Sequence, residues 1–110
     1  MDQSTLCPRF EKGMQLLSKR WTVLIIYQLL SGPKRFGTIE SSIPISGRLL
    51  SERLKDLESE GIVNRHIYPE IPVRIEYSLT EKGFALEPII RDMEQWCKQW
   101  IELEEETTVR

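Results

Sequence analysis

Residues 36–80 carry the sequence pattern that most restricts the fold of this chain. Apolar residues at helical spacing predict a short helix over residues 36–42, which Pro44 ends. Ser46 is a favourable N-cap for a second helix, which stops at Gly61. Two short helices separated by such a tight connection are typical of a helix-turn-helix.

The segment that follows predicts a two-stranded antiparallel ribbon. Residues 62–68 form one strand, residues 69–72 form a tip with two prolines, and residues 73–79 alternate apolar and polar side chains as the return strand. Thr80 then provides the N-cap of a long final helix. The expected fold class is therefore mainly α with a small β-ribbon (α+β). It is a winged helix-turn-helix, a shape that places one helix in the DNA major groove and the ribbon beside it.

Two further helices are expected before this pattern. The first runs from Pro8 to Leu17, because proline suits the first helical position and apolar residues recur at steps of three and four up to Trp21. Residues 21–30 are apolar at nearly every position, which predicts a central helix that is buried all round. This stretch is too short to span a bilayer, which takes about 20 residues.

The length of 110 residues is typical of a single domain over residues 1–110, with a frayed tail from residue 104. Residues 1–50 hold seven Lys and Arg against three Asp and Glu, whereas residues 51–110 hold eight against fourteen. The acidic C-terminal end would repel phosphate. The chain starts without a secretory signal pattern, and two distant cysteines make no disulfide scaffold, so a cytoplasmic protein is expected.

The second helix of the helix-turn-helix carries a short face of basic and hydroxyl side chains. If Leu50, Leu54 and Leu57 point into the core, the opposite side near the helix start is polar. Arg48 can bind a guanine bidentately, and its neighbours suit base edges or phosphates. The expected DNA-binding residues of this helix are Ser46, Gly47, Arg48, Ser51 and Lys55. The alternative is an ordinary amphipathic helix with a solvated charged face.

The ribbon adds three candidate DNA contacts near its tip, namely Arg65, His66 and Arg74. Arginine near the end of a wing can reach phosphates or the minor groove. His66 is the only histidine, and no Cys, His or Asp cluster surrounds it in the sequence, so neither a metal nor a cofactor is expected. The alternative is a plain surface hairpin.

The last helix carries an apolar face that is too broad for one small domain to cover. Apolar residues recur in two neighbouring rows from Leu86 to Leu103. The natural cover is a second copy of the chain, and a two-fold homodimer would match a palindromic operator. The expected dimer contacts are Phe10, Met14, Ile89, Met93, Trp96 and Trp100. The alternative is a helix folded back on its own domain.

Cys7 and Cys97 are candidates for redox sensing. Cys7 precedes a helix start and is close in sequence to Arg9 and Lys12, an electropositive setting that is typical of reactive thiols. Cys97 falls on the expected interface, so an intersubunit disulfide between the two is one hypothesis. In the alternative, Cys97 is a small buried hydrophobe and Cys7 is inert. A thiol enzyme is disfavoured, because there is no Cys-x-x-Cys motif and His66 is far from Cys7 in sequence.

Together these features resemble the HxlR-type winged helix-turn-helix regulators, from Cys7-Pro8 to about Trp100. The resemblance implies a cytoplasmic homodimer that binds double-stranded operator DNA, and we expect a repressor. One branch of the family is similar in carrying an N-terminal Cys-Pro, and its members sense quinones, aldehydes, hypochlorite or disulfide stress. This likeness implies that oxidants or electrophiles modify Cys7. The ordered segments that carry the resemblance are Lys19-Arg20-Trp21, Gly32-Pro33-Lys34-Arg35-Phe36, Arg53-Leu54-Lys55-Asp56-Leu57-Glu58, Gly61-Ile62-Val63 and Glu76-Tyr77-Ser78-Leu79-Thr80.

Three alternatives stay open at this point. A cysteine at the position of Cys97 is not general in the family, so mixed disulfides or adducts on Cys7 alone compete with a Cys7–Cys97 disulfide. The same DNA-binding regulator could be controlled by a small ligand, without a thiol switch. A winged helix could also serve protein–protein contacts only, in which case no salt-dependent operator binding is expected.

Overall fold

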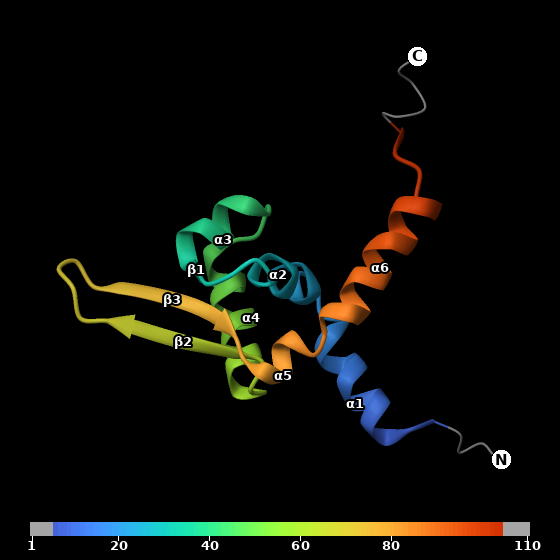
Figure 1. Cartoon of the computed structure of the whole chain (residues 1–110), viewed down its shortest axis with the longest axis horizontal. Helices are drawn as coiled ribbons and strands as arrows, with labels where there is room; N and C mark the ends of the chain where they lie inside the picture. Colours follow the sequence, from blue (N-terminus) through green and yellow to red (C-terminus); the bar gives the residue numbers. More distant parts are fainter. Residues whose placement is uncertain (1–5, 105–110) are drawn as a thin grey trace.

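The computed structural model describes residues 6–104. Figure 1 shows a helical body from which the β2–β3 ribbon projects on one side, while α1 and α6 extend on the other. This arrangement confirms the predicted winged helix-turn-helix of mainly α class. The elements are α1 (Pro8–Leu17), α2 (Thr22–Leu29), β1 (Lys34–Arg35), α3 (Phe36–Ser42), α4 (Gly47–Ser59), β2 (Val63–Tyr68), β3 (Arg74–Leu79), α5 (Glu81–Phe84) and α6 (Glu87–Trp100).

The sheet is antiparallel and has the strand order β1-β3-β2. The two ribbon strands pair from Val63 opposite Leu79 to Tyr68 opposite Arg74. The strand β1 was not predicted, because two residues are too short to show an alternating pattern. Its pairing with β3 fixes the start of α3 against the base of the ribbon.

The hydrophobic core lies between α2, α3, α4 and the base of the ribbon, and it includes the leucine stripe predicted for α4. The prediction that α2 is buried all round was wrong, because Leu24 is 48% exposed. One side of α2 faces an apolar groove beside α6 instead of a continuous core. The core residues with no exposed surface are Ile25, Ile26, Leu29, Ile39, Leu50 and Leu57.

The turn between α1 and α2 depends on Trp21, which was predicted to continue the apolar faces of both helices. Instead Trp21 is the N-cap of α2 and has a positive φ of 79°. Such a φ is strained for a bulky residue, so the surrounding contacts must hold it. The Arg20 guanidinium lies 4.6 Å from the centroid of the Trp21 ring, and Arg53 Nε donates to the Arg20 carbonyl at 2.9 Å. The turn is thereby tied to α4.

The C-terminal segment forms two helices, so the prediction of one continuous helix was wrong. The Thr80 hydroxyl accepts a hydrogen bond from the Gly83 backbone N–H at 3.1 Å, but the helix that it caps has only four residues. Pro88 has no N–H, and its ring would clash with the carbonyl of the preceding turn. A new helix therefore begins, with Pro88 in its first turn. It ends at Trp100, which leaves Leu103 outside it; of the predicted frayed tail, residues 105–110 lie outside the described residues.

Gly83 is required by close packing where α5 passes the start of the ribbon. A Cβ at this position would lie 2.5 Å from the Ile62 carbonyl oxygen and 3.0 Å from Leu79 Cδ2. Gly83→Ala is therefore expected to lower the free energy of unfolding by ~1–3 kcal/mol, as overpacking usually does. Urea denaturation measures the change. Gly37→Ala, at a helical glycine with open space around it, is the matched control and should gain stability; an equal effect of both substitutions would contradict the close packing.

Candidate nucleic-acid interface

The start of α4 presents an exposed basic side chain beside a capped helix end. The Ser46 hydroxyl accepts a hydrogen bond from the Leu49 backbone N–H at 3.1 Å, so Ser46 is the N-cap that the sequence predicted. The Arg48 side chain is 91% exposed, and its Nε lies 3.8 Å from Glu52 Oε2. A solvent-exposed pair of this kind contributes little free energy. The Arg48 guanidinium can therefore exchange Glu52 for a phosphate or a base edge.

Gly47 serves the packing of α3 against α4. A Cβ at this position would lie 2.8 Å from Glu40 Oε2 and 3.9 Å from the Phe36 ring. Gly47 is one of the expected DNA-binding residues, and a glycine leaves room for a ligand to approach the backbone. In this structure the Glu40 carboxylate occupies that room, and its flexible side chain could move aside.

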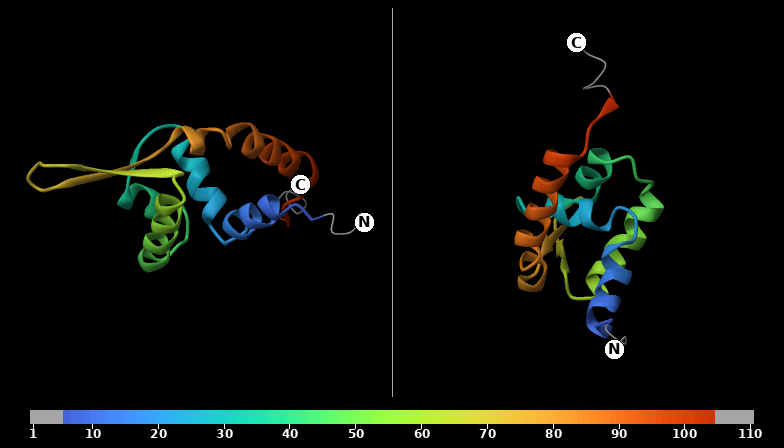
Figure 2. Two further views of the ribbon diagram at one scale, coloured as in Figure 1. Left: turned by 90° about the horizontal axis from the view of Figure 1, so that it is seen from below. Right: turned by 90° about the vertical axis from the view of Figure 1, so that its right-hand side faces the viewer.

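The fold brings α4 and the ribbon together around a cavity of about 250 Å³. Ser51 and Lys55 line it from α4, and Arg65 lines it from β2. Lys55 and Arg65 are exposed, so two cations from different elements border one hollow. Glu58 also lines the cavity and partly offsets their charge. The first view of Figure 2 shows α4 under the base of the ribbon.

Arg74, a predicted phosphate contact, is held inside the wing. Its Nη2 lies 2.9 Å from Glu70 Oε2, and its Nη1 lies 2.6 Å from Glu76 Oε2. Its guanidinium carbon lies 3.8 Å from the centroid of the Tyr68 ring. The hydrogen bonds to Glu70 and Glu76 raise the pKa of Arg74. Together with the contact to the Tyr68 ring, they brace the ribbon near its tip. His66, which pairs with Glu76 across the ribbon, is exposed, and the centroid of its ring lies 5.7 Å from that of the Tyr68 ring.

The brace at the wing tip is expected to weaken in acid. The hydrogen bond from Arg74 holds the pKa of Glu70 below its ordinary value of 4.5. A carboxyl whose pKa is lower in the folded protein than in the unfolded chain stabilises the fold when the pH is above the unfolded-chain pKa. This stabilisation is lost as the pH falls through the pKa of the folded protein. Amide NMR shifts around Tyr68 should therefore change below about pH 4.5. In Arg74→Gln the change should move to higher pH; an unchanged titration would show that the pair does not brace the wing.

Arg35 is a candidate that the sequence reasoning did not single out. It is exposed on β1 directly opposite Glu76 of β3, and its charge helps to lower the pKa of Glu70. It therefore lies on the sheet edge next to the wing brace. The sequence feature that could have indicated Arg35 is the pair of adjacent cations, Lys34 and Arg35, immediately before a predicted helix.

The helix α6 is anchored to α2 by a polar contact. The Tyr27 hydroxyl donates to Glu94 Oε2 at 2.6 Å, which raises the pKa of Tyr27 and lowers that of Glu94. Arg91 and Lys98 add ion pairs to the same carboxylate. This contact lies beside a groove of about 490 Å³ with a mostly apolar lining. The groove and the anchor together set the direction in which α6 leaves the body.

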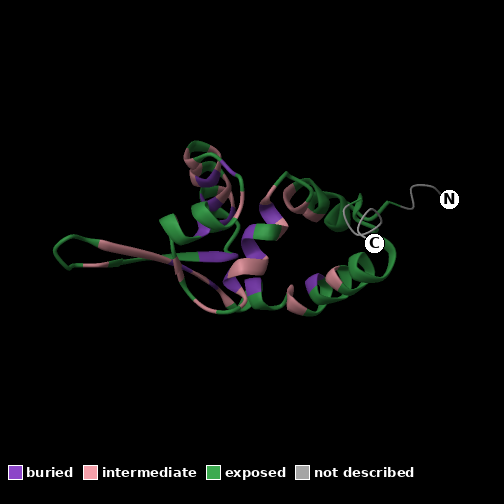
Figure 3. Ribbon diagram, turned by 90° about the horizontal axis from the view of Figure 1, so that it is seen from above, coloured by how far each residue is buried: buried purple, intermediate pink, exposed green. Residues whose placement is uncertain are grey.

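The predicted dimer contacts are exposed on α1 and α6. Figure 3 shows both helices as largely exposed arms at the end of the molecule opposite the ribbon. Within α6 only Ile90 is buried, so its own domain leaves most of this helix uncovered. An apolar groove of about 220 Å³ is lined by both arms. The exposed fractions lie between 40% and 65% for Phe10, Met14, Ile89, Met93, Trp96 and Trp100.

Both cysteines are free and exposed. Cys7 is the N-cap of α1, with Pro8 at the first helical position, as predicted. Cys97 lies on α6 and lines the apolar groove beside α2. It is therefore not a buried hydrophobe in the single chain. The two thiols lie on the two exposed arms.

Among residues 6–104, every helix is too short or too polar to span a bilayer. Within the same range, no group of three or more His, Cys, Asp or Glu side chains is placed to hold a metal ion.

Comparisons with known proteins agree with this geometry. A family model described as HxlR-like helix-turn-helix matches residues 16–105. The chain is 58% identical over 103 residues to the uncharacterized HTH-type transcriptional regulator YvaP of Bacillus subtilis (strain 168), covering 93% of this chain and 95% of YvaP. It is 49% identical over 100 residues to the HTH-type transcriptional regulator YodB of the same organism, covering 90% and 89% of the two chains.

Solved structures of similar proteins include different chemical states. The reduced form of YodB from B. subtilis matches with a TM-score of 0.77 at 48% identity, covering 89% of this chain and 97% of that one. Quinone-bound YodB matches with a TM-score of 0.75 at 45% identity, covering 86% and 100%. The oxidized form of the redox regulator HypR matches with a TM-score of 0.83 at 36% identity, covering 88% and 100%.

Proposed function

The chain belongs to the HxlR-like helix-turn-helix family of DNA-binding transcriptional regulators, and from this premise we propose that it is a homodimeric repressor controlled through Cys7. Oxidation or alkylation of the Cys7 thiol would lower its affinity for the operator. The observation that carries the proposal is the exposed thiol at the N-cap of α1, on an arm that also presents apolar side chains. A regulator, and not an enzyme, is what the named relatives indicate.

The DNA-binding surface of the proposal combines the start of α4 with the ribbon. Its residues are Ser46, Gly47, Arg48, Ser51, Lys55, Arg65 and His66, with Arg74 supporting the ribbon from within. In a two-fold dimer, two copies of this surface would meet successive major grooves of one duplex. The residues Phe10, Met14, Ile89, Met93, Trp96 and Trp100 would then be covered by the second copy, which removes a large exposed apolar surface.

The thiol part of the proposal is supported by the relatives. Structures of YodB exist in reduced and quinone-bound forms, and HypR is described as a redox regulator with an oxidized form. The exposed Cys7 of this chain is open to the same classes of reagent. A covalent adduct or a disulfide at the start of α1 would change how the two arms pack against a second copy. That change would shift the population that is competent to bind DNA.

A gel shift on the DNA upstream of the gene for this protein tests the proposal directly. The reduced protein should bind, with an affinity that falls steeply as salt rises, because cationic side chains displace counterions from phosphate. Diamide should release it, and dithiothreitol should restore binding. Non-reducing gels of the same samples show whether a covalent dimer forms. Absence of any salt-dependent binding would favour a winged helix used only for protein contacts.

Arg48→Ala tests the recognition face. Loss of a bidentate contact to a base is expected to weaken operator binding by ~1–3 kcal/mol and to relax specificity at one base position. Competition gel shifts with single-base operator variants measure both effects. Lys98→Ala, which removes an exposed cation from α6, is the matched control and should bind like the wild type. If the two variants are indistinguishable, the recognition face has been misplaced.

A further inference from the structure

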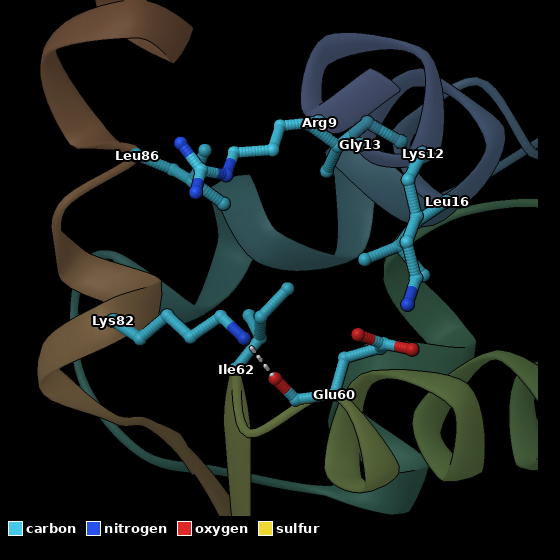
Figure 4. Close-up of a pocket in the computed structure, with 9 residues that line it drawn as sticks. Arg9, Lys12, Gly13, Leu16, Glu60, Ile62, Lys82 and Leu86 are labelled. Atoms are coloured by element: carbon cyan, nitrogen blue, oxygen red, sulfur yellow. Dashed lines mark hydrogen bonds between the residues drawn. The ribbon is translucent and has the colours of Figure 1, made fainter.

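A cavity of about 410 Å³ lies where α1 meets the end of α4, the start of β2, and α5 (Figure 4). Its size is within the range of small-molecule sites. Its floor is apolar and is formed by Leu16, Leu17, Ile62 and Leu86. None of the DNA-binding candidates contributes to it, so the cavity is distinct from the nucleic-acid interface.

Three cationic side chains also line the cavity, namely Arg9, Lys12 and Lys82. Figure 4 shows Arg9 extending toward Leu86, and Lys12 extending toward the side of the cavity that holds Glu60. Among residues 6–104, neither Arg9 nor Lys12 has an ion-pair partner within 4.0 Å. Lys82 Nζ donates to the Glu60 backbone carbonyl at 2.6 Å. Glu60 supplies the single carboxylate of the lining, so the cavity carries a net positive charge.

Gly13 keeps the α1 side of this cavity open. A glycine inside a helix lowers stability by roughly 0.5–1 kcal/mol relative to alanine. At Gly13 a Cβ would have no neighbour within 4 Å, and the backbone does not need a positive φ. Packing and backbone geometry therefore give no reason for glycine here. Its effect is to leave the space above the apolar floor unfilled.

We propose that this cavity binds a small organic anion with an apolar body, such as an aromatic carboxylate or sulfonate. The long, exposed side chains of Arg9 and Lys12 extend to different sides of the cavity in Figure 4 and have no ion-pair partner within 4.0 Å among residues 6–104, and they turn inward to bind the anionic group. The apolar body lies on the floor formed by leucine and isoleucine side chains. A cation or an uncharged polar molecule would lack this complementarity.

The cavity is placed to influence DNA binding, and this step alone rests on the proposed function. It is lined on one side by α1, the arm that carries Cys7, and on the other by Glu60 at the end of α4. A bound anion would hold these two elements together. It would favour one orientation of the arm relative to the recognition helix. Its effect on operator affinity is limited by the difference between its affinities for the two orientations.

Binding is tested on the reduced full-length protein without DNA, with 1-anilinonaphthalene-8-sulfonate as the probe. Its fluorescence rises in an apolar site, so a titration gives the dissociation constant. The expected result is saturable binding that weakens about tenfold or more in Arg9→Gln/Lys12→Gln, since both charge-assisted contacts to the sulfonate are lost. Gly13→Leu should abolish the binding by filling the cavity. N-phenyl-1-naphthylamine, which lacks the sulfonate, should bind more weakly and equally to the wild type and the double variant.

Two controls separate this site from the apolar grooves beside α6. Lys98→Gln removes an exposed cation near the α2–α6 groove and should leave probe binding unchanged. Gly37→Leu adds the same side chain at another open helical glycine and should also leave it unchanged. Circular dichroism confirms that each variant is folded. Wild-type affinity in both Gly13→Leu and the double variant would overturn the proposal.

The coupling is then tested by repeating the operator gel shift with the probe present. A shift in operator affinity that disappears in Gly13→Leu supports coupling through the cavity. Probe binding without such a shift leaves the anion site intact and overturns only its regulatory role. If the protein binds no operator at all, the proposed function fails while the fluorescence titration still decides the anion site.

Discussion

Cys7→Ser is expected to bind the operator like the wild type and to ignore diamide and quinones. Serine keeps the N-cap position of α1 and can even accept a hydrogen bond there, so the fold and the DNA-binding surface should be unaffected. The hydroxyl does not form disulfides or thiol adducts under these conditions. The wild type should lose operator affinity by about tenfold or more on oxidation, which corresponds to ~1.4 kcal/mol or more. Gel shifts across a diamide and a quinone titration measure the difference.

Cys97→Ser is the matched control for that experiment, because Cys97 is the other exposed thiol. If Cys97 forms a disulfide with Cys7 across the dimer, this variant loses the corresponding covalent dimer on non-reducing gels. If mixed disulfides or adducts on Cys7 alone release the operator, the variant responds like the wild type. A Cys7→Ser protein that still releases DNA under oxidant would remove the sensor from the proposal.

Trp96→Asp is expected to dissociate the dimer and with it operator binding. Trp96 is 57% exposed in the single chain and lies in the apolar face of α6, where a second copy would cover it. Tryptophans at the centre of interfaces commonly contribute 2 kcal/mol or more, which is roughly thirtyfold in affinity. In a two-fold interface the change occurs twice, and each copy also brings a carboxylate into an apolar contact. Analytical ultracentrifugation and gel shifts measure the two losses.

Gln95→Asp provides the control for Trp96→Asp. It adds the same charge at a neighbouring exposed position of α6 that is not part of the apolar face. It should remain dimeric and bind DNA. A Trp96→Asp protein that sediments as the wild type does would show that α6 is not the dimer contact. A monomer that still binds the operator with full affinity would show that pairing of two copies is not needed.

The sequence predicted the helical and strand segments well where one local pattern dominates. The leucine spacing in α4 and the serine before it predicted a helix from residue 47 with a buried stripe, and both were confirmed. The alternation in β3 also predicted its strand correctly. The break before Pro88 was not predicted, although a proline interrupts a helix because it has no backbone N–H. Trp21 looked like an apolar helix position, because periodicity counts hydrophobic residues and does not report φ.

The candidate site, like the fold, was predictable from the sequence only where a local feature carries the signal. The residue types on α4 and the thiol before Pro8 were readable in the sequence, because hydrogen-bonding groups and nucleophiles are properties of single side chains. The pairing of Arg74 with Glu70 and Glu76 was not, because several nearby carboxylates compete for each arginine. The cavity lined by Arg9 could not be predicted for a similar reason, since its lining comes from four separate segments.

The amino-acid order alone determined which segments are helix or strand, which helix faces are apolar, and which side chains bear charge or a thiol. These are local properties set by backbone sterics, side-chain chemistry and spacing of a few residues. The tertiary structure decided that α1 and α6 stand away from the core, that Arg74 is held inside the wing, and that three cations surround an apolar hollow. Such features depend on which distant segments pack together, and that is settled by the free energy of the whole chain and not by any one stretch.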